Sequence, residues 1–171
     1  MNGYEFYPED GSTLYEEEAW ELSERARSLW LRLTFAGEYS EGMSPVQIQG
    51  RKYLPMFPAR DGVYTIEQVR EKFLAVFSKE FTDKTLNAAI ASKDLLEYNG
   101  NVYAAYKKNR GKTSYNSWAD HVRDDGNGKF TVVMGVSMPP DGSTVYVELP
   151  TERNAAGKFV FTDYPYWDRS E

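Results

Sequence analysis

The alternation of apolar and polar residues toward the C-terminus is the feature that most constrains this chain. Apolar residues recur at every second position over 130–138, 145–149 and 159–161. This period of two predicts three strands, each with one apolar face. The segments between them, Pro-Pro-Asp-Gly at 139–142 and Asn-Ala-Ala-Gly at 154–157, contain residues that favour tight turns. We therefore expect an antiparallel meander that must bury one face against other elements.

The segments upstream of the meander have the apolar spacing of helices. Apolar residues follow the helical repeat over 14–33 and 66–77, and a shorter helix is expected over 81–90. Thr13 with Glu16, and Thr65 with Gln68, have the form of capping boxes. The Pro- and Gly-containing segment 38–62 is expected to be a long connection with one short strand at 48–54. We expect Trp20 and Trp30 to pack in the core.

A hairpin and one more strand complete the expected fold. Asn99-Gly100 separates two short runs of β-type residues, which is a strong hairpin signal, and 118–123 is expected to pair as a further strand. We therefore predict an α+β fold in which N-terminal helices pack on a C-terminal antiparallel β-meander. It is expected to form a single domain of residues 1–171, with 1–11 as a flexible N-terminal extension.

The charge of the chain favours a protein partner over nucleic acid. The sequence contains 20 Lys and Arg against 26 Asp and Glu, a formal net charge of −6. Nucleic-acid binding needs a basic surface, so we expect none, whereas a basic protein would associate faster with an acidic surface. The alternative is that this is ordinary solubilising charge. No stretch is apolar for long enough to span a membrane or to serve as the core of a signal peptide.

The residues that could perform chemistry are few. The chain has no cysteine, and His121 is its single histidine, which excludes thiol catalysis and the usual Cys and His zinc site. The segment 120–126 has a passing likeness to a calcium loop but lacks the closing glutamate. Two of the three carboxylates Asp120, Glu148 and Asp163 could act as an acid–base pair. So acidic a chain is, however, expected to contain such pairs by chance. We therefore expect a protein that is not an enzyme, with no metal and no cofactor.

The order of these features matches a known family along most of the chain. The match rests on the opening helix with Ala19, Leu22 and Trp30, on Tyr-Thr-Ile-Glu-Gln-Val at 64–69 leading to Phe77, on Tyr-Asn-Gly-Asn-Val-Tyr at 98–103, and on Trp118 and the meander. In this order the chain resembles the secreted peptidoglycan DL-endopeptidase inhibitors of the IseA type. The resemblance implies a protein that is extracellular or at the bacterial cell surface, and we expect the export signal to be absent from this chain. We also expect a monomer. The resemblance further implies a cleft between helical and sheet portions, and inhibition of NlpC-type cysteine peptidases by covering their active-site groove.

If the resemblance holds, acidic residues steer a basic cell-wall hydrolase and tyrosines contact it. The expected partner-binding residues, chosen by charge and loop position, are Asp120, Asp124, Asp125, Asp163, Tyr106, Tyr115, Tyr164 and Tyr166. A shallow acidic groove rimmed by the four tyrosines would favour this hypothesis.

Two alternatives remain open from the sequence. Helices leading into a curved antiparallel sheet also describe the cystatin-like cone of nuclear-transport-factor type, which binds small apolar molecules. There Asp120 or His121 would be the base, and a deep pocket with a carboxylate of raised pKa would favour that function. The other alternative is a cell-wall-associated binding module whose basic segment 107–112 touches an anionic wall polymer.

Overall fold

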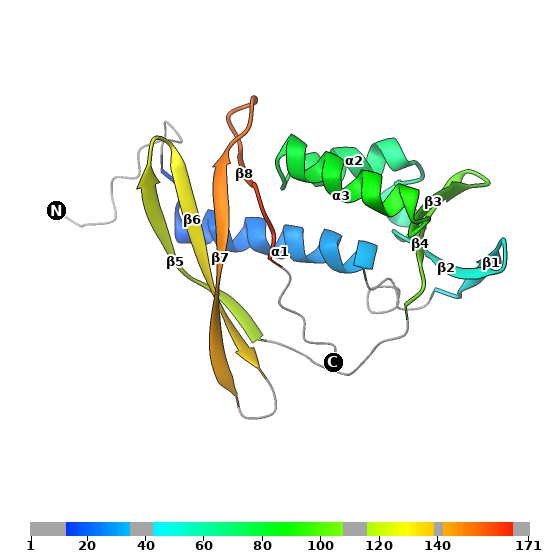
Figure 1. Ribbon diagram of the computed structural model, residues 1–171, viewed down its shortest axis with the longest axis horizontal. Coiled ribbons are helices and arrows are strands. Elements are labelled where there is room, and N and C mark those ends of the chain that lie inside the picture. The colour runs from blue at the N-terminus through cyan, green and yellow to red at the C-terminus, as the bar shows by residue number, and fades with distance from the viewer. Residues whose placement is uncertain (1–12, 35–42, 108–115, 139–141, 166–171) are drawn as a thin grey trace.

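The computed structural model describes residues 13–34, 43–107, 116–138 and 142–165. Within these ranges it has three α-helices and two antiparallel sheets of four strands each (Figure 1). The helices are α1 (Glu16–Thr34), α2 (Ile66–Leu74) and α3 (Lys79–Ala91), with a short 3₁₀ helix at Ala59–Asp61. The predicted α+β class, with helices preceding the C-terminal strands, is therefore confirmed.

The predicted meander forms most of the second sheet, which we call sheet B. Its strands, in the order in which they pair, are β5 (Asn116–Gly126), β6 (Lys129–Met138), β7 (Ser143–Arg153) and β8 (Phe159–Phe161). Val132 on β6 lies between Val122 on β5 and Leu149 on β7. These side chains belong to the inner face of sheet B, which packs against α1. The alternation in the sequence therefore predicted both the strands and the buried face.

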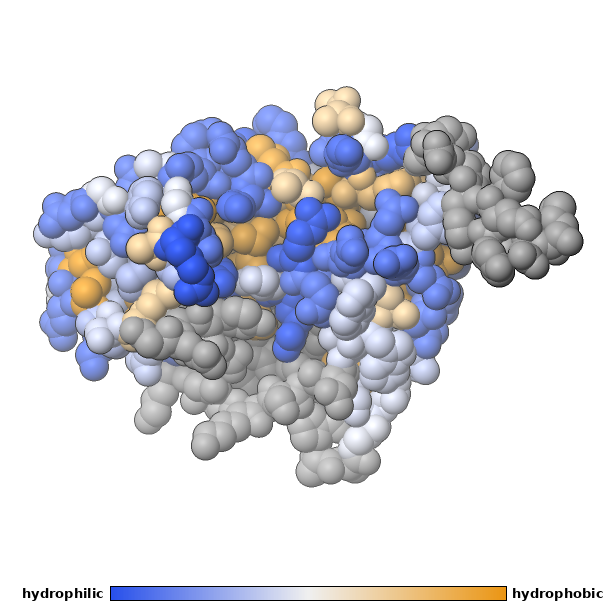
Figure 2. All heavy atoms as spheres, turned by 180° about the vertical axis from the view of Figure 1, so that it is seen from behind, coloured by the Kyte–Doolittle hydropathy of each residue, from blue (hydrophilic) through white to orange (hydrophobic). Residues whose placement is uncertain are grey.

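Helix α1 packs through one apolar stripe. Its buried positions include Ala19, Leu22, Ala26, Leu29 and Leu33, which follow the three- and four-residue spacing of one helix face. Trp20 lies beside this stripe and is 36% exposed, so the prediction that it packs in the core is wrong. Seen from behind, the molecule presents hydrophilic side chains that frame an apolar strip (Figure 2).

The first sheet, sheet A, differs from the expectation for the connection after α1. Where one strand was expected at 48–54, the chain forms a hairpin of β1 (Val46–Ile48) and β2 (Arg51–Pro55). Its turn residues Gln49 and Gly50 both have positive φ, at 53° and 81°. The predicted hairpin at Asn99-Gly100 is confirmed as β3 (Leu95–Tyr98) and β4 (Asn101–Ala105). Since β2 pairs with β4, the strand order is β1-β2-β4-β3.

The helix pair α2–α3 is fixed at both of its N-termini. The capping box predicted at Thr65 and Gln68 is present in full at the start of α2. Helix α3 begins at Lys79, two residues before the expected start, because the Ser78 side chain accepts a hydrogen bond from the Phe81 N–H. The backbone N–H of Ser78 also donates to the Phe161 carbonyl of β8 at 2.8 Å. The turn between the helices is therefore tied to the edge of sheet B.

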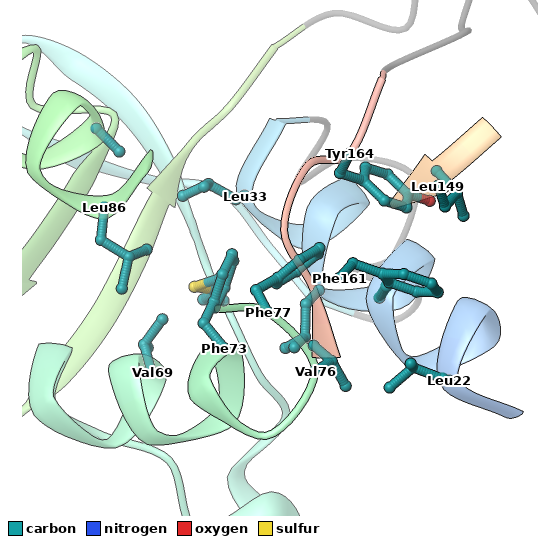
Figure 3. Close-up of a cluster of buried hydrophobic side chains, with 14 of the residues drawn as sticks. Leu22, Leu33, Val69, Phe73, Val76, Phe77, Leu86, Leu149, Phe161 and Tyr164 are labelled. Carbon is teal, nitrogen blue, oxygen red and sulfur yellow. The ribbon is translucent and has the colours of Figure 1, made fainter. Parts of the chain in front are cut away.

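A continuous apolar core joins the helices to sheet B. Phe73 on α2 and Phe77 in the turn after it face Phe161 on β8 and Tyr164 just beyond, with α1 beside them (Figure 3). The Phe77 and Tyr164 rings meet edge to face, with centroids 5.6 Å apart. A smaller cluster of Ile48, Tyr53 and Ala105 packs separately on sheet A. The larger cluster is therefore what positions α1 over the inner face of sheet B.

Candidate functional site: an acidic groove beside α1

The structure separates the eight residues expected to bind a partner. Asp120, Asp124 and Asp125 lie on β5, and Asp163 is exposed just after β8. Tyr106 follows β4 and is 39% exposed. Tyr115 and Tyr166 lie outside the described residues, as do positions 108–112 of the basic segment.

Tyr164 has a buried position rather than one at the rim of a groove. Its side chain is 5% exposed and its ring packs against Trp30, Phe77 and Phe161. A side chain in such an aromatic cluster stabilises the core and offers little surface to a partner.

Asp120 forms a small polar cluster with its neighbours on β5. One carboxylate oxygen accepts from the Trp118 indole N–H at 3.4 Å, and the other lies 2.8 Å from Nδ1 of His121. The hydrogen bond from His121, aided by that from Trp118, holds the pKa of Asp120 below its ordinary value. A carboxylate with a lowered pKa is a weak general base, so this geometry does not favour the cone-type hypothesis.

Asp125 is part of an ion-pair cluster centred on Arg123. The guanidinium contacts Asp125 at 2.8 Å and Glu148 on β7 at 2.7 Å, and it also donates to the Thr131 hydroxyl. The hydrogen bond from Arg123, together with that from Thr131, lowers the pKa of Asp125. Asp124 accepts from the Gly126 N–H and so stabilises the turn. Of the four aspartates predicted to steer a partner, Asp125 is therefore neutralised by Arg123, which also pairs with Glu148.

A different set of acidic residues lines an open groove between α1 and β5. The groove has a volume of about 680 Å³, and its walls combine Leu14, Tyr15 and Val122 with four glutamates, Glu16, Glu17, Glu18 and Glu21. A second hollow, of about 510 Å³, lies between α1, the end of α2 and the turn from β7 to β8. Because the two hollows share Leu14, Glu18 and Glu21, they flank the same half of α1. We call the first hollow the acidic groove.

The carboxylates of the acidic groove differ from those on β5 in their partners. All four glutamates are exposed, and none takes part in an ion pair among the described residues. Their charge is therefore available to a ligand from outside. The sequence does show three consecutive glutamates here, but in a first helical turn such residues are explained by the helix dipole alone. Only the packing of β5 beside α1 turns them into the wall of a groove.

Other kinds of site find little support in the described part of the chain. Residues 13–34, 43–107, 116–138 and 142–165 contain no group of three or more His, Asp or Glu that could hold a metal ion. No helix in these ranges is long and apolar enough to cross a membrane. The acidic groove is open to solvent, unlike the deep pocket that the cone-type hypothesis requires.

Comparison with known proteins does not extend these observations. No protein-family model matches the chain, and a search of curated proteins finds no significant match.

Proposed function

We propose that this protein binds a basic protein through its acidic groove. On the resemblance to the IseA type, we further propose that the partner is a bacterial cell-wall hydrolase of the NlpC class and that binding covers its active-site groove. The observation that carries the proposal is the set of four exposed glutamates along one groove, none of them in an ion pair among the described residues. Such a surface attracts cationic partners and repels acidic ones.

Two further features support a binding role. The groove lies between α1 and β5, which agrees with the cleft between helical and sheet portions that the resemblance implies. Its lining also includes the half-buried Val122, whose remaining apolar surface a partner would cover, and burial of apolar surface supplies affinity that charge alone does not.

The test is hydrolysis of purified peptidoglycan by an NlpC-type endopeptidase, with and without the protein. The informative variant replaces Glu17, Glu18 and Glu21 by glutamine. The matched control makes the same three-charge change at Glu67, Glu71 and Glu80, which are exposed on α2 and α3. We expect the groove variant to raise the inhibition constant about tenfold or more and to reduce its salt dependence, because the attraction to the partner is lost.

The control variant defines the outcomes that count against the proposal. It should inhibit within about twofold of the unmodified protein, because exposed charges far from an interface affect binding weakly. Equal weakening by both variants would show that only net charge matters and that the groove is not the contact. Absence of inhibition across several NlpC-type enzymes would contradict the proposal that the partner is a cell-wall hydrolase.

A further inference from the structure

The outer face of sheet B, turned away from α1, contains two aromatic side chains on either side of a glycine. In the register of the sheet, Gly135 on β6 lies between Trp118 on β5 and Tyr146 on β7. Trp118 is half-buried, and Tyr146 is 59% exposed. Neighbouring strands are about 4.8 Å apart, so the two residues flank a strip of sheet about 10 Å wide. We call Trp118, Gly135 and Tyr146 the aromatic platform.

Gly135 allows the indole to lie across the sheet. A Cβ at this position would be 2.4 Å from Cε2 and Cζ2 of Trp118 and 2.7 Å from its Nε1. These atoms belong to both rings of the indole, so the ring system lies over the backbone of β6. Any larger residue at 135 would push the indole away from the sheet. The glycine therefore keeps the platform flat and brings Trp118 toward Tyr146.

Polar groups lie at the edge of the platform. A shift in the β5–β6 register between Ala119 and His121 leaves Asp120 as the extra residue of a β-bulge, and bulges re-aim side chains. Asp120 binds the indole N–H with one oxygen and His121 with the other. Each carboxylate oxygen has a second lone pair that can accept from a ligand hydroxyl.

We propose that the aromatic platform is a binding site for a sugar ring of a pyranose oligosaccharide. A pyranose whose hydroxyl groups are equatorial has two flat faces of C–H groups and a polar edge. The faces suit the rings of the half-buried Trp118 and the exposed Tyr146, and the edge suits the carboxylate of Asp120 and the imidazole of His121. Nucleic acid fits less well, because the carboxylate of Asp120 beside the indole repels phosphate. A purely apolar ligand would leave the polar edge without a role.

This site is independent of the proposed function. The acidic groove includes Val122, whose side chain lies on the inner face of sheet B, whereas the platform lies on the outer face. Substitutions in one site should therefore leave the other unchanged, and each proposal can fail without the other.

Titration calorimetry with two soluble probes tests the platform. Cellohexaose offers hydroxyl groups only, and chitohexaose adds N-acetyl groups. We expect at least one probe to bind the intact chain, with the dissociation constant raised about tenfold by Trp118→Ala or Tyr146→Ala. Trp20→Ala and Tyr98→Ala serve as matched controls, since these rings are 36% and 44% exposed elsewhere on the surface, and should change it by less than about twofold.

Several results would overturn the proposal. They are absence of binding to both probes, binding that Trp118→Ala and Tyr146→Ala leave unchanged, and binding that the two control variants weaken equally. Tyr146→Ala keeps the test valid if the tryptophan variant fails to fold, because the Tyr146 side chain is mostly exposed. Binding of one probe but not the other supports the platform and tells whether N-acetyl groups are required or excluded.

Discussion

At the scale of single residues, the contact between Gly135 and Trp118 makes a prediction about stability. Gly135→Ala should lower the free energy of unfolding by about 1–3 kcal/mol, because the new methyl group meets the indole at 2.4 Å. In a Trp118→Ala background the same change should be close to neutral or stabilising, since alanine is better tolerated than glycine within a strand. Urea denaturation of the four proteins in this cycle measures the coupling. An equal cost in both backgrounds would show that the indole is not the cause.

The sequence predicted the secondary structure around Trp118, but it did not predict what surrounds the side chains of Trp118 and Tyr164. Trp118 was expected in a strand, and it is, but the sequence does not show that its indole lies over Gly135, because their contact joins different strands. Tyr164 follows the last strand in an acidic, aromatic segment that suggests a surface, yet it is buried. In both cases the environment comes from residues distant in the chain.

At the scale of elements, the C-terminus of α3 is fastened to β2 by an ion pair. Arg51 on β2 contacts Asp94 at 2.5 Å and donates to the carbonyls of Ser92 and Lys93 at the end of the helix. Burial acts to raise the pKa of Asp94, but hydrogen bonds from Arg51 and Ser92 and the charge of Lys107 outweigh it. The net effect is a pKa below the ordinary value of 3.8. The ionised carboxylate therefore stabilises the folded state.

We accordingly expect Asp94→Asn to lower the free energy of unfolding by about 0.5–1 kcal/mol at pH 7, as for other partly exposed ion pairs. Because the folded-state pKa is depressed, this contribution is complete above the unfolded-state pKa. It is lost as the pH falls through the lower folded-state value. The difference between the two proteins, followed by urea denaturation from pH 7 to pH 2, should shrink toward the acid end. Asp61→Asn, an exposed substitution of the same charge, is the control, and a difference that grows at low pH would contradict the assignment.

Elements were predictable from sequence where the signal is local. The capping box at Thr65 and the Asn99-Gly100 hairpin depend on residues a few positions apart, and both are present. The hairpin of β1 and β2 was missed because Gln49 is an uncommon residue for a turn with positive φ, although Gly50 suits it. The start of α3 was placed two residues late because Ser78 was not considered as its N-cap.

At the scale of the whole molecule, the arrangement of the helices on sheet B could not be predicted from the sequence. The apolar periods identify which faces are buried but not what covers them. The acidic groove depends on α1 and β5 lying side by side, and these elements are about a hundred residues apart in the chain. The same holds for the bond from Ser78 to Phe161, which joins the turn between α2 and α3 to β8.

The shared core predicts that the helices and sheet B unfold together. Phe161 is fully buried between the helix pair and sheet B, so Phe161→Ala should lower the free energy of unfolding by about 3–5 kcal/mol. Because one cluster includes side chains from α3 and from β6, hydrogen exchange in both elements should accelerate by the same factor. Ile48→Ala, in the separate small cluster on sheet A, should instead loosen β1 and β2 more than β6. Acceleration confined to β7 and β8 in the Phe161 variant would mean that the two parts are energetically independent.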